Sequence, residues 1–463
     1  MKILQYIPGM PPVMVGGMIK YALDLAQEEK EAGHEIVLLV PGKFTHLHKE
    51  TSKIVKRKWK SIDCYRIINS VPVSGGKGMQ NVSALRMRGD KALFIKFLFK
   101  ENPSIIHVHS FMGLPIAFFE AAAELRIPIV YTTHDYYGIC PKAILLNDME
   151  QCMTTDGSQC PYCIDGVMTI KKIKWQQSPI YGMLKKNPII NFLEYSQKLV
   201  PIKIYIRSMH KKYEKQRHRS ESILAKIQEE QEYLEIQRYY KEMFGYVTRF
   251  HYNSIQAKEI FTQYMGNISG EVISISNKNI SDRRKKRALG KKLRIGFIGR
   301  GAYKGFDLLK ETLQSLFEEG LQDFECHVYF NPKEKLPPYI ISHKPYKEDE
   351  MDRIYDGIDI LVLPSVWKET YGLVVLEALS YGIPVIVSQS VGAKELLAGC
   401  NGMGVIVKPT KEALYEALKN VYCNRDLLER MNLKICNCDL RLNYEEHVHD
   451  MINMYEKTII LKK

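Results

Sequence analysis

The chain lacks any apolar run long enough to cross a membrane as a helix. Its first nineteen residues carry few charges, but prolines and glycines interrupt residues 8–17 and no cleavage-like site follows them. We therefore interpret this start as a strand and a loop rather than as a signal peptide. This interpretation places the chain in the cytoplasm, where its ten cysteines are expected to be reduced.

Patterns typical of several other protein classes are also missing. The sequence has no fixed short repeat and no low-complexity tract, and its 45% hydrophobic and 25% charged residues are ordinary for a globular protein. The net charge of +14 implies anionic partners such as nucleic acid, lipid headgroups or phosphorylated small molecules. Because no zinc-finger, recognition-helix or base-stacking pattern is present, we do not expect a nucleic-acid partner.

The sequence does contain a regular alternation of apolar strands and amphipathic helices. Strands are expected at residues 2–8, 34–41, 104–110 and 128–135, with helices at 16–33 and 115–127. A second series of the same kind begins near residue 292, and 463 residues exceed one ordinary core. Continuous apolar strands separated by helices predict an α/β protein with two Rossmann-like, doubly wound parallel-sheet domains and a ligand site between them.

Two strongly basic segments set the domain limits. Residues 171–242 contain 16 Lys and Arg against 8 Asp and Glu, and residues 278–294 contain nine against one. We expect an N-terminal domain at 1–277 with a helical insertion at about 165–245, a linker at 278–292, and a second domain at 293–440. The insertion is either a helical element with a solvated basic face or a surface that docks on anionic lipid.

Four motifs follow expected strands, where a ligand of such a sheet binds. Arg300 and Lys304 in "GRGAYKG" could clamp a diphosphate, or could be surface cations of a turn. In "KETYGLVVLEALSYGIPVIVS", Glu369 falls in a loop, and the amides of Gly372, Leu373 and Val374 open a helix that is ready for an anion. Glu377 on that helix could accept hydrogen bonds from a diol, or could only stabilise the helix through its interaction with the helix dipole.

The other two motifs lie in the first domain. Gly16 and Gly17 lead into a helix and could approach a phosphate or a sugar, or form only a turn. His134 in "TTHDYYGICP" and His109 in "IIHVHS" are at strand ends, where an imidazole can bind a sugar hydroxyl or move a proton. We expect His109 to face the site and His107 to point to the opposite side.

Together these motifs closely resemble the signature of family 4 retaining glycosyltransferases. Glu369, seven intervening residues and Glu377 match its specific block, and the GG loop, "THD", "GR…KG" and "VGAKELL" occur in the same order. The resemblance spans nearly the whole chain. It implies a GT-B fold whose C-terminal helix, residues 441–463, crosses back to the first domain.

The resemblance also implies roles. Arg300 and Lys304 would hold the donor diphosphate, although their spacing is about one residue shorter than usual. Glu369 would contact the donor sugar and Glu377 the ribose, with the amides of 372–374 on phosphate or sugar. Gly16 and Gly17 would approach the donor from the opposite domain, and His134 and His109 would lie on the acceptor side. His134, Arg300, Lys304 and Glu369 would then be the catalytic residues.

The chemistry implied is transfer of a sugar from a UDP- or GDP-sugar to a glycan or lipid-linked acceptor, in bacterial surface polysaccharide synthesis. The family uses protein cations, and no Asp-X-Asp metal pair is present, so no metal cofactor is expected in catalysis. The enzyme would be cytoplasmic or peripheral on the inner face of the membrane. The alternatives are a nucleotide-sugar epimerase of the GT-B fold, a phosphorylase of that fold, and a non-catalytic module that binds a nucleotide or a glycan.

Four cysteines are close together in the sequence. Cys140, Cys152, Cys160 and Cys163 lie within 24 residues and end in "CPYC", a pattern that could bind a structural zinc ion. Reduced thiols in an acceptor-side loop are the other interpretation. The remaining six cysteines are scattered, and we interpret them as small core residues.

Overall fold

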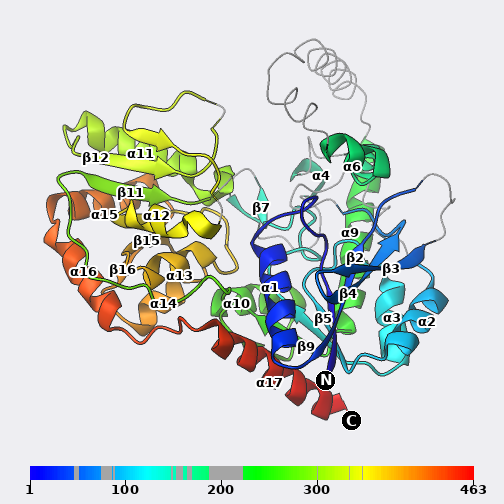
Figure 1. Cartoon of the computed structure of the whole chain (residues 1–463). Coiled ribbons are helices and arrows are strands. Elements are labelled where there is room, and N and C mark those ends of the chain that lie inside the picture. Colours follow the sequence, from blue (N-terminus) through cyan, green and yellow to red (C-terminus); the bar gives the residue numbers. More distant parts are fainter. Residues whose placement is uncertain are drawn as a thin grey trace.

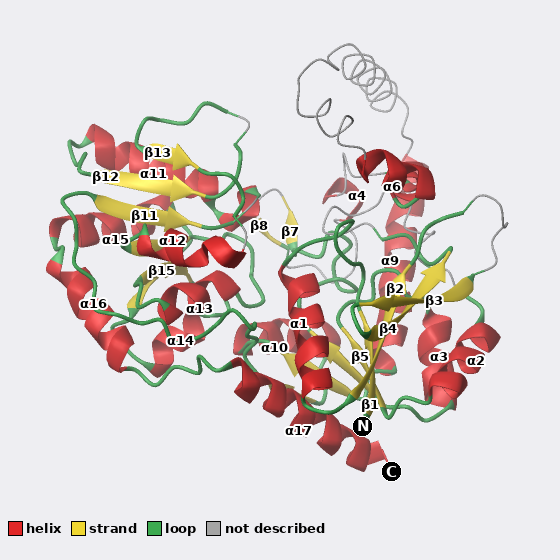
Figure 2. Ribbon diagram, in the orientation of Figure 1, coloured by secondary structure: helices red, strands yellow, loops and turns green. Residues whose placement is uncertain are grey.

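Two α/β domains lie side by side in the computed structural model of the chain (Figures 1 and 2). The structure describes residues 1–463 except 46–51, 74–85, 87–88, 148–149, 153–159, 164–168, 187–222, 300, 333, 347 and 463. None of the helices in these ranges combines the length and the apolar character needed to cross a bilayer.

The first domain has an eight-stranded sheet in the order β10-β9-β6-β5-β1-β2-β4-β3, parallel except for the β3–β4 pair. Its strands are β1 Lys2–Tyr6, β2 Glu35–Pro41, β3 Lys53–Trp59, β4 Ile62–Ile68, β5 Ile105–Val108, β6 Ile129–Thr132, β9 Arg249–Tyr252 and β10 Gly270–Val272. Its helices are α1 Gly17–Glu31, α2 Lys91–Glu101, α3 Ile116–Glu124, α4 Cys160–Cys163, α5 Ile170–Gln176, α6 Pro179–Lys186, α9 Ile223–Gly245 and α10 Ile255–Met265, beside a small β7 Leu146–Asn147 and β8 Glu150–Gln151 hairpin.

The second domain has a six-stranded, fully parallel sheet in the order β13-β12-β11-β14-β15-β16. Its strands are β11 Leu293–Phe297, β12 Phe324–Val328, β13 Ile340–Ser342, β14 Ile360–Leu363, β15 Val385–Ser388 and β16 Gly404–Val407. Its helices are η4 Ala302–Lys304, α11 Phe306–Glu318, η5 Glu348–Glu350, α12 Met351–Asp356, α13 Leu373–Ser380, α14 Lys394–Gly399, α15 Lys411–Cys423 and α16 Asp426–Asn437. Numbered 1 to 6 along the chain, these strands lie in the order 3-2-1-4-5-6 of a doubly wound sheet. The predicted fold class is therefore confirmed.

The strands are buried because helices cover both faces of each sheet. Strands β5, β6, β14 and β15 are buried at every position, which explains why each reads as a continuous apolar run. The carboxyl ends of β11 and β14 lead directly into the loops that carry Lys304 and Glu369. The fold therefore positions these motifs at one edge of the second sheet.

The last helix, α17 Tyr444–Lys462, leaves the second domain and lies along the first (Figure 1). It buries Val448, Met451, Met454 and Tyr455, and it packs against α1. Near its end, Lys462 Nζ donates to the carbonyl of Ile127 at 3.2 Å. The C-terminal segment thus ties the domains together.

The basic linker is bound to the second domain rather than free in solvent. Arg287 donates to the carbonyls of Tyr355 and Ile358, and Arg284 donates to those of Ile435 and Cys438. Lys285 pairs with Asp356 at 2.7 Å. The two arginines satisfy carbonyl groups near helix ends and Lys285 pairs with an acidic side chain, so the positive charge of this segment has a structural use.

The predicted insertion is only partly described, because residues 187–222 lie outside the described ranges. Its last helix, α9, is not a solvated appendage. It places Tyr240, Met243 and Phe244 in the core of the first domain, where Phe244 packs on Phe111 with ring centroids 4.6 Å apart.

Candidate active site

Lys304 and Glu369 meet at the edge of the second sheet, although 64 residues separate them in the sequence. Lys304 Nζ forms an ion pair with Glu369 Oε1, and it lies 5.4 Å from the centre of the Trp367 ring. Ser365 Oγ donates to the other carboxylate oxygen at 2.8 Å. Only 6% of Glu369 is exposed, so a cation and a hydroxyl compensate a charge that is largely removed from water.

Residues of the first domain hold the backbone around Glu369. Gln256 Nε2 donates to the carbonyls of Glu369 and Ser390, at 2.9 and 2.8 Å. The Thr370 hydroxyl donates to the carbonyl of His134 at 2.9 Å, and the Tyr136 hydroxyl donates to that of Lys368 at 2.7 Å. The loop is therefore fixed by both domains and lies at their junction.

Helix α13 begins at this loop, as the sequence predicted. Its capping residue, Gly372, has φ 101° and ψ 63°, in the left-handed region that favours glycine. A Cβ on Gly372 would lie 2.9 Å from the Val391 side chain and 3.6 Å from the Glu369 carboxyl carbon. The first amides of α13, at Leu373 and Val374, thus lie beside the Lys304–Glu369 pair, where a helix N-terminus attracts an anion.

Glu377 lies one turn further along α13 and is held by two side chains. Tyr355 OH donates to its Oε2 at 2.8 Å, and Asn277 Nδ2 donates to its Oε1 at 3.4 Å. Burial raises the pKa of this carboxyl, and the two hydrogen bonds oppose that rise. One lone pair on each oxygen remains for a further donor, which fits the predicted contact with a diol.

The GG loop forms the start of α1, as the sequence predicted. Gly16 caps the helix and Gly17 is its first residue. Both are exposed, and a Cβ on either would meet nothing within 4 Å. On the next turn, Lys20 pairs with Glu348 of the second domain at 3.0 Å, so this end of α1 lies against the opposite domain.

His134 belongs to a buried chain of hydrogen bonds in the first domain. Its Nε2 lies 3.1 Å from Nδ1 of His109, whose Nε2 lies 3.2 Å from Oε1 of Gln5. Gln5 donates to Oε2 of Glu29 at 2.5 Å. His109 is fully buried, so it supports His134 and does not itself face the site, which corrects the expectation from sequence.

His107 also differs from the expectation. We predicted that it points away from His109, but the two ring centroids are only 4.0 Å apart. The reason is the strand geometry: residues two apart share one face of a strand. His107 therefore belongs to the same buried cluster and remains a core residue, as predicted.

The hydrogen-bond partners fix the protonation pattern of this chain. Gln5 Oε1 can only accept, so His109 donates from Nε2, and burial lowers the pKa of His109 so that its ring is neutral. His109 Nδ1 must then accept from the Nε2–H of His134. His134 therefore keeps a lone pair on Nδ1, and it is suited to accept a proton from a hydroxyl rather than to donate one.

Sequence reasoning missed the residues that support the site. Gln256, Tyr355 and Asn277 lie far from every motif in the sequence, and Gln5 and Glu29 occur in an ordinary strand and helix. The one signal in the sequence was Glu29, a carboxylate on the buried face of α1. Because an unpaired charge is rarely buried, a carboxylate at such a position indicates polar partners in the core. Arg300 lies outside the described residues, so its predicted role stays a prediction.

Of the two interpretations of the clustered cysteines, the structure agrees with reduced thiols, because none of the four belongs to a disulfide. Within the described ranges, no three His, Cys, Asp or Glu side chains are placed to hold one metal ion, so Cys140, Cys152, Cys160 and Cys163 form no zinc site there. Cys163 Sγ instead donates to the carbonyl of Leu146 at 3.3 Å.

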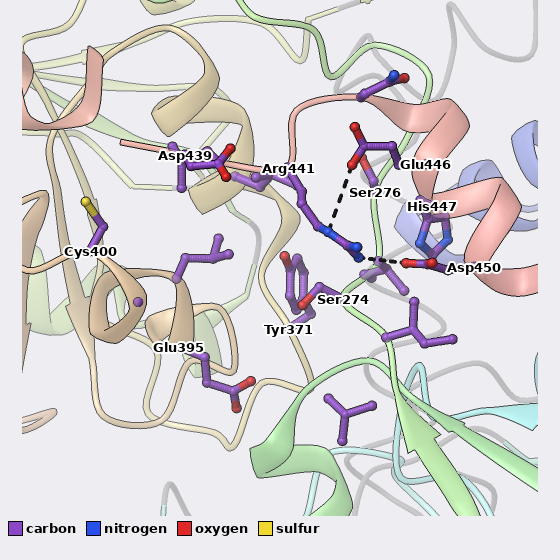
Figure 3. Close-up of a pocket in the computed structure, with 18 of the residues that line it drawn as sticks. Ser274, Ser276, Tyr371, Glu395, Cys400, Asp439, Arg441, Glu446, His447 and Asp450 are labelled. Carbon is purple, nitrogen blue, oxygen red and sulfur yellow. Dashed lines mark hydrogen bonds and ion pairs between the residues drawn. The ribbon is translucent and has the colours of Figure 1, made fainter. Parts of the chain in front are cut away.

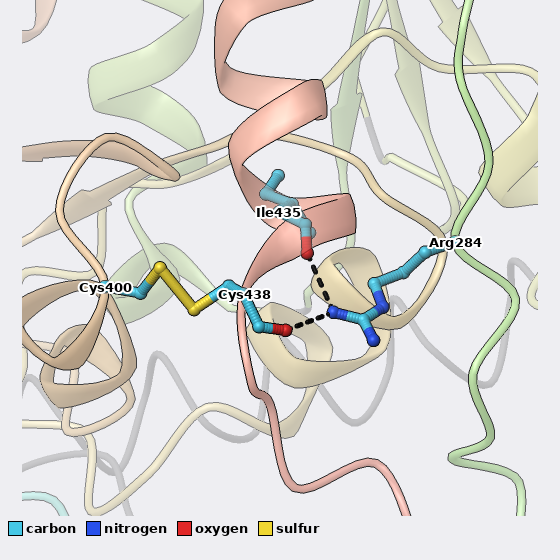
Figure 4. Close-up of a disulfide and its surroundings, with 4 residues drawn as sticks. All are labelled: Arg284, Cys400, Ile435 and Cys438. Atoms are coloured by element: carbon cyan, nitrogen blue, oxygen red, sulfur yellow. Dashed lines mark hydrogen bonds between the residues drawn. A yellow bond between two sulfur atoms is a disulfide. The ribbon is translucent and has the colours of Figure 1, made fainter.

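One cysteine expectation is wrong, and it concerns a pair that the sequence gave no reason to join. Cys400 at the end of α14 and Cys438 after α16 form a disulfide, with Cα atoms 6.4 Å apart (Figure 4). We had expected all ten cysteines to be reduced. Arg284 donates to the carbonyl of Cys438 at 2.6 Å and thereby holds the same segment from the other side.

Comparisons with known proteins agree with this architecture. Residues 15–150 match the family model described as Glycosyltransferase Family 4, and residues 292–424 match the model described as Glycosyl transferases group 1. The sulfoquinovosyl transferase SQD2 of Arabidopsis thaliana is 34% identical over 104 residues, which cover 22% of this chain and 20% of that protein. The match therefore spans about a fifth of the length of this relative.

Solved structures resemble the chain over nearly its whole length. A sucrose-phosphate synthase from Thermosynechococcus elongatus superposes with a TM-score of 0.56 at 13% identity, covering 99% of each chain. Alr3699/HepE of Anabaena, solved in complex with UDP and glucose, superposes with a TM-score of 0.55 at 14% identity, covering 98% of this chain and 99% of that one. At such identities the likeness shows the shared fold alone.

Proposed function

Because the chain belongs to the group 1, family 4 glycosyltransferases of the GT-B fold, we propose that it transfers a sugar from a nucleoside diphosphate donor, a UDP- or GDP-sugar, to a glycan or lipid-linked acceptor with retention of the anomeric configuration. The observation that carries this proposal is the position of Lys304. Its ammonium lies beside Glu369 and the N-terminus of α13, and Glu377 follows one turn later on the same helix.

Each group has one task in the proposed reaction. Glu377 accepts hydrogen bonds from the two ribose hydroxyls, and Glu369 orients the donor sugar. Lys304 and the amides of α13 bind the diphosphate, and they stabilise the negative charge that it gains in the transition state. Arg300 would assist Lys304.

The bond changes follow from this placement. The bond between the anomeric carbon and the diphosphate oxygen breaks, and the acceptor oxygen forms a bond to the same face of that carbon. The acceptor proton moves to the departing phosphate oxygen. His134 accepts a hydrogen bond on Nδ1 from a sugar hydroxyl and thereby orients it. In this scheme protein cations do the work of a metal, so we propose that activity needs no divalent ion.

A thermal-shift panel of UDP-, GDP- and ADP-sugars tests the donor assignment. We expect one nucleotide class to raise the melting temperature and the other two to leave it unchanged. Glu377→Ala should abolish that shift, because it removes both acceptors for the ribose diol. Glu412→Ala, which removes an exposed carboxylate at the start of α15, is the control and should keep the shift. No shift with any donor would instead favour a non-catalytic module.

We further propose that the enzyme works at an anionic membrane surface on the cytoplasmic side, where a lipid-linked acceptor would be found, in surface polysaccharide synthesis. Three apolar side chains of α5 and α6 are exposed, namely Trp175 (46%), Ile180 (55%) and Met183 (70%). Lys171, Lys172 and Lys174 are exposed beside them, which is the composition of an interfacial surface.

Flotation with liposomes tests the membrane proposal. We expect the protein to float with vesicles that contain anionic lipid at low salt and to be released at high salt. Trp175→Ser combined with Met183→Ser should weaken flotation, whereas Ile406→Ser, an exposed apolar residue of β16, should not. Equal flotation with neutral vesicles, or none with anionic ones, would contradict the proposal.

A further inference from the structure

Gln5 is a fully buried polar side chain in the middle of the first sheet. It lies on β1 among apolar neighbours, and none of its surface is exposed. A glutamine in such a place is costly unless both ends of its amide form hydrogen bonds. Gln5 meets this condition with two partners, because its Nε2 donates to Glu29 and its Oε1 lies 3.2 Å from Nε2 of His109.

The two ends of the Gln5 amide are not interchangeable at this place. Oε1 of Glu29 lies 2.9 Å from the hydroxyl of Tyr455 and can donate its proton there. Oε2 of Glu29 then only accepts, as it also does when the carboxyl is ionised. The nitrogen of the Gln5 amide must therefore face Glu29, and its oxygen must face His109.

The helix that carries Tyr455 also supports His134 from a second direction. Near its start, α17 is fixed by the ion pair between Asp450 and Arg441, at 2.7 Å (Figure 3). On the same turn, Nε2 of His447 lies 2.9 Å from the hydroxyl of Tyr21. The Tyr21 ring packs edge-on against the His134 ring, with centroids 4.9 Å apart. The contacts of α17 with the first domain thus lead to His134 along two routes.

The direction of the hydrogen bonds decides what His134 can do. With the Gln5 oxygen towards His109, His109 donates from Nε2 and accepts on Nδ1, so His134 keeps the lone pair of its own Nδ1. If Gln5 offered no acceptor, His109 could instead hold its proton on Nδ1 and donate it to His134. His134 would then carry its proton on Nδ1 and could no longer accept from a hydroxyl.

We propose that Gln5 is a positioning residue for His134: it fixes the tautomer in which Nδ1 of His134 accepts a hydrogen bond from a substrate hydroxyl. Gln5 does not itself touch the substrate, because it is buried behind His109. Its effect on activity rests on the proposed function, whereas its effect on the tautomer can be measured without any substrate.

¹⁵N NMR spectra of the full chain, labelled in its histidine rings, test the tautomer, since ring nitrogens with and without a proton resonate far apart. The spectra are taken near pH 7, where His134 is neutral because burial lowers its pKa. The His134 signals are those that disappear in His134→Asn. We expect a single tautomer with the proton on Nε2 in the original protein.

Gln5→Leu leaves the buried Nε2–H of His109 without an acceptor. Because such an orphaned donor is costly, we expect roughly a third or more of His134 to convert to the tautomer with its proton on Nδ1. His134 signals identical to those of the original protein would overturn the proposal.

Two matched variants separate this effect from a general loss of packing. Glu29→Gln keeps an acceptor for the Gln5 amide, so it should keep the single tautomer. Ile3→Ala opens a cavity on the same face of β1 and lowers stability, but it should also leave the His134 signals unchanged. A changed tautomer in Ile3→Ala would show that His134 responds to packing alone and would refute the assignment to Gln5.

The donor identified by the thermal-shift panel tests the consequence for activity. We expect Gln5→Leu to lower kcat about five- to tenfold while KM for the donor stays within about twofold, because the chain of hydrogen bonds orients a hydroxyl and does not bind the diphosphate. A shifted tautomer with an unchanged kcat would refute the role of Gln5 in the reaction. If no donor is found, the proposed function fails, but the spectra still decide whether Gln5 sets the tautomer.

Discussion

Lys304→Met is expected to lower kcat/KM by about 10²–10³-fold with the donor that stabilises the protein. Methionine keeps most of the apolar stem that lies over Trp367 but removes the ammonium group. The charge that develops on the leaving diphosphate would then be stabilised only by the amides of α13 and by Arg300. Steady-state kinetics measure the effect, and Lys310→Met, which removes a partly buried lysine of α11 that pairs with Glu334, is the matched control.

Lys304→Met is also expected to lower the stability of the protein, and this effect can be distinguished from the loss of activity. Removing Lys304 leaves the carboxylate of Glu369 buried without its cation, so the protein should lose stability. Adding Glu369→Gln neutralises that carboxylate and should restore stability without restoring activity. A Lys304→Met enzyme within threefold of the original kcat/KM would contradict the assignment of Lys304 to the diphosphate.

Glu29→Gln is expected to remove a pH dependence of folding stability. Glu29 is fully buried, and burial raises the pKa of its carboxyl to about 8. The folded protein therefore holds a proton that the unfolded chain releases above an ordinary glutamate pKa of about 4.5. The contribution of Glu29 to the free energy of unfolding is fully present below pH 4.5. It decreases as the pH rises towards 8 and changes little above that.

The hydrogen bonds around Glu29 agree with a protonated carboxyl. Tyr455 OH lies 2.9 Å from Glu29 Oε1 and 2.7 Å from His107 Nδ1. If Glu29 carries the proton, Tyr455 can donate to His107, and His107 can donate from Nε2 to Thr132, 2.6 Å away. Thr132 then donates to Nδ1 of His251. The His251 ring is neutral, because burial lowers its pKa to about 4. Every group in the chain is satisfied in this arrangement.

Glutamine at position 29 reproduces these bonds, because its amide donates to Tyr455 and accepts from Gln5. Between pH 5.5 and 8, we expect the original protein to lose on the order of 3 kcal/mol relative to Glu29→Gln. Denaturant unfolding at several pH values measures this difference. Glu31→Gln removes an exposed carboxylate on the same helix, and its unfolding free energy should change with pH as that of the original protein does. The same pH dependence in Glu29→Gln as in the original protein would refute the prediction.

The motifs of the proposed donor site could be recognised in the sequence because they are local. Glu369, the Gly372 cap and Glu377 lie within nine residues, so the loop and the first turns of α13 bring them near one another without a long-range contact. Their partners could not be predicted in the same way. Gln256 and Thr370 join residues from different domains, and nothing in the sequence near either one indicates the contact.

The sequence by itself determined the two parallel sheets, because a strand buried on both faces must be apolar throughout and each motif must follow such a strand. Only the tertiary structure decided which side chains meet: the Lys304–Glu369 pair, the burial of His109 behind His134 and the Cys400–Cys438 disulfide. The physical reason is that periodicity encodes burial, whereas the pairing of polar side chains depends on how the two domains and α17 pack against each other.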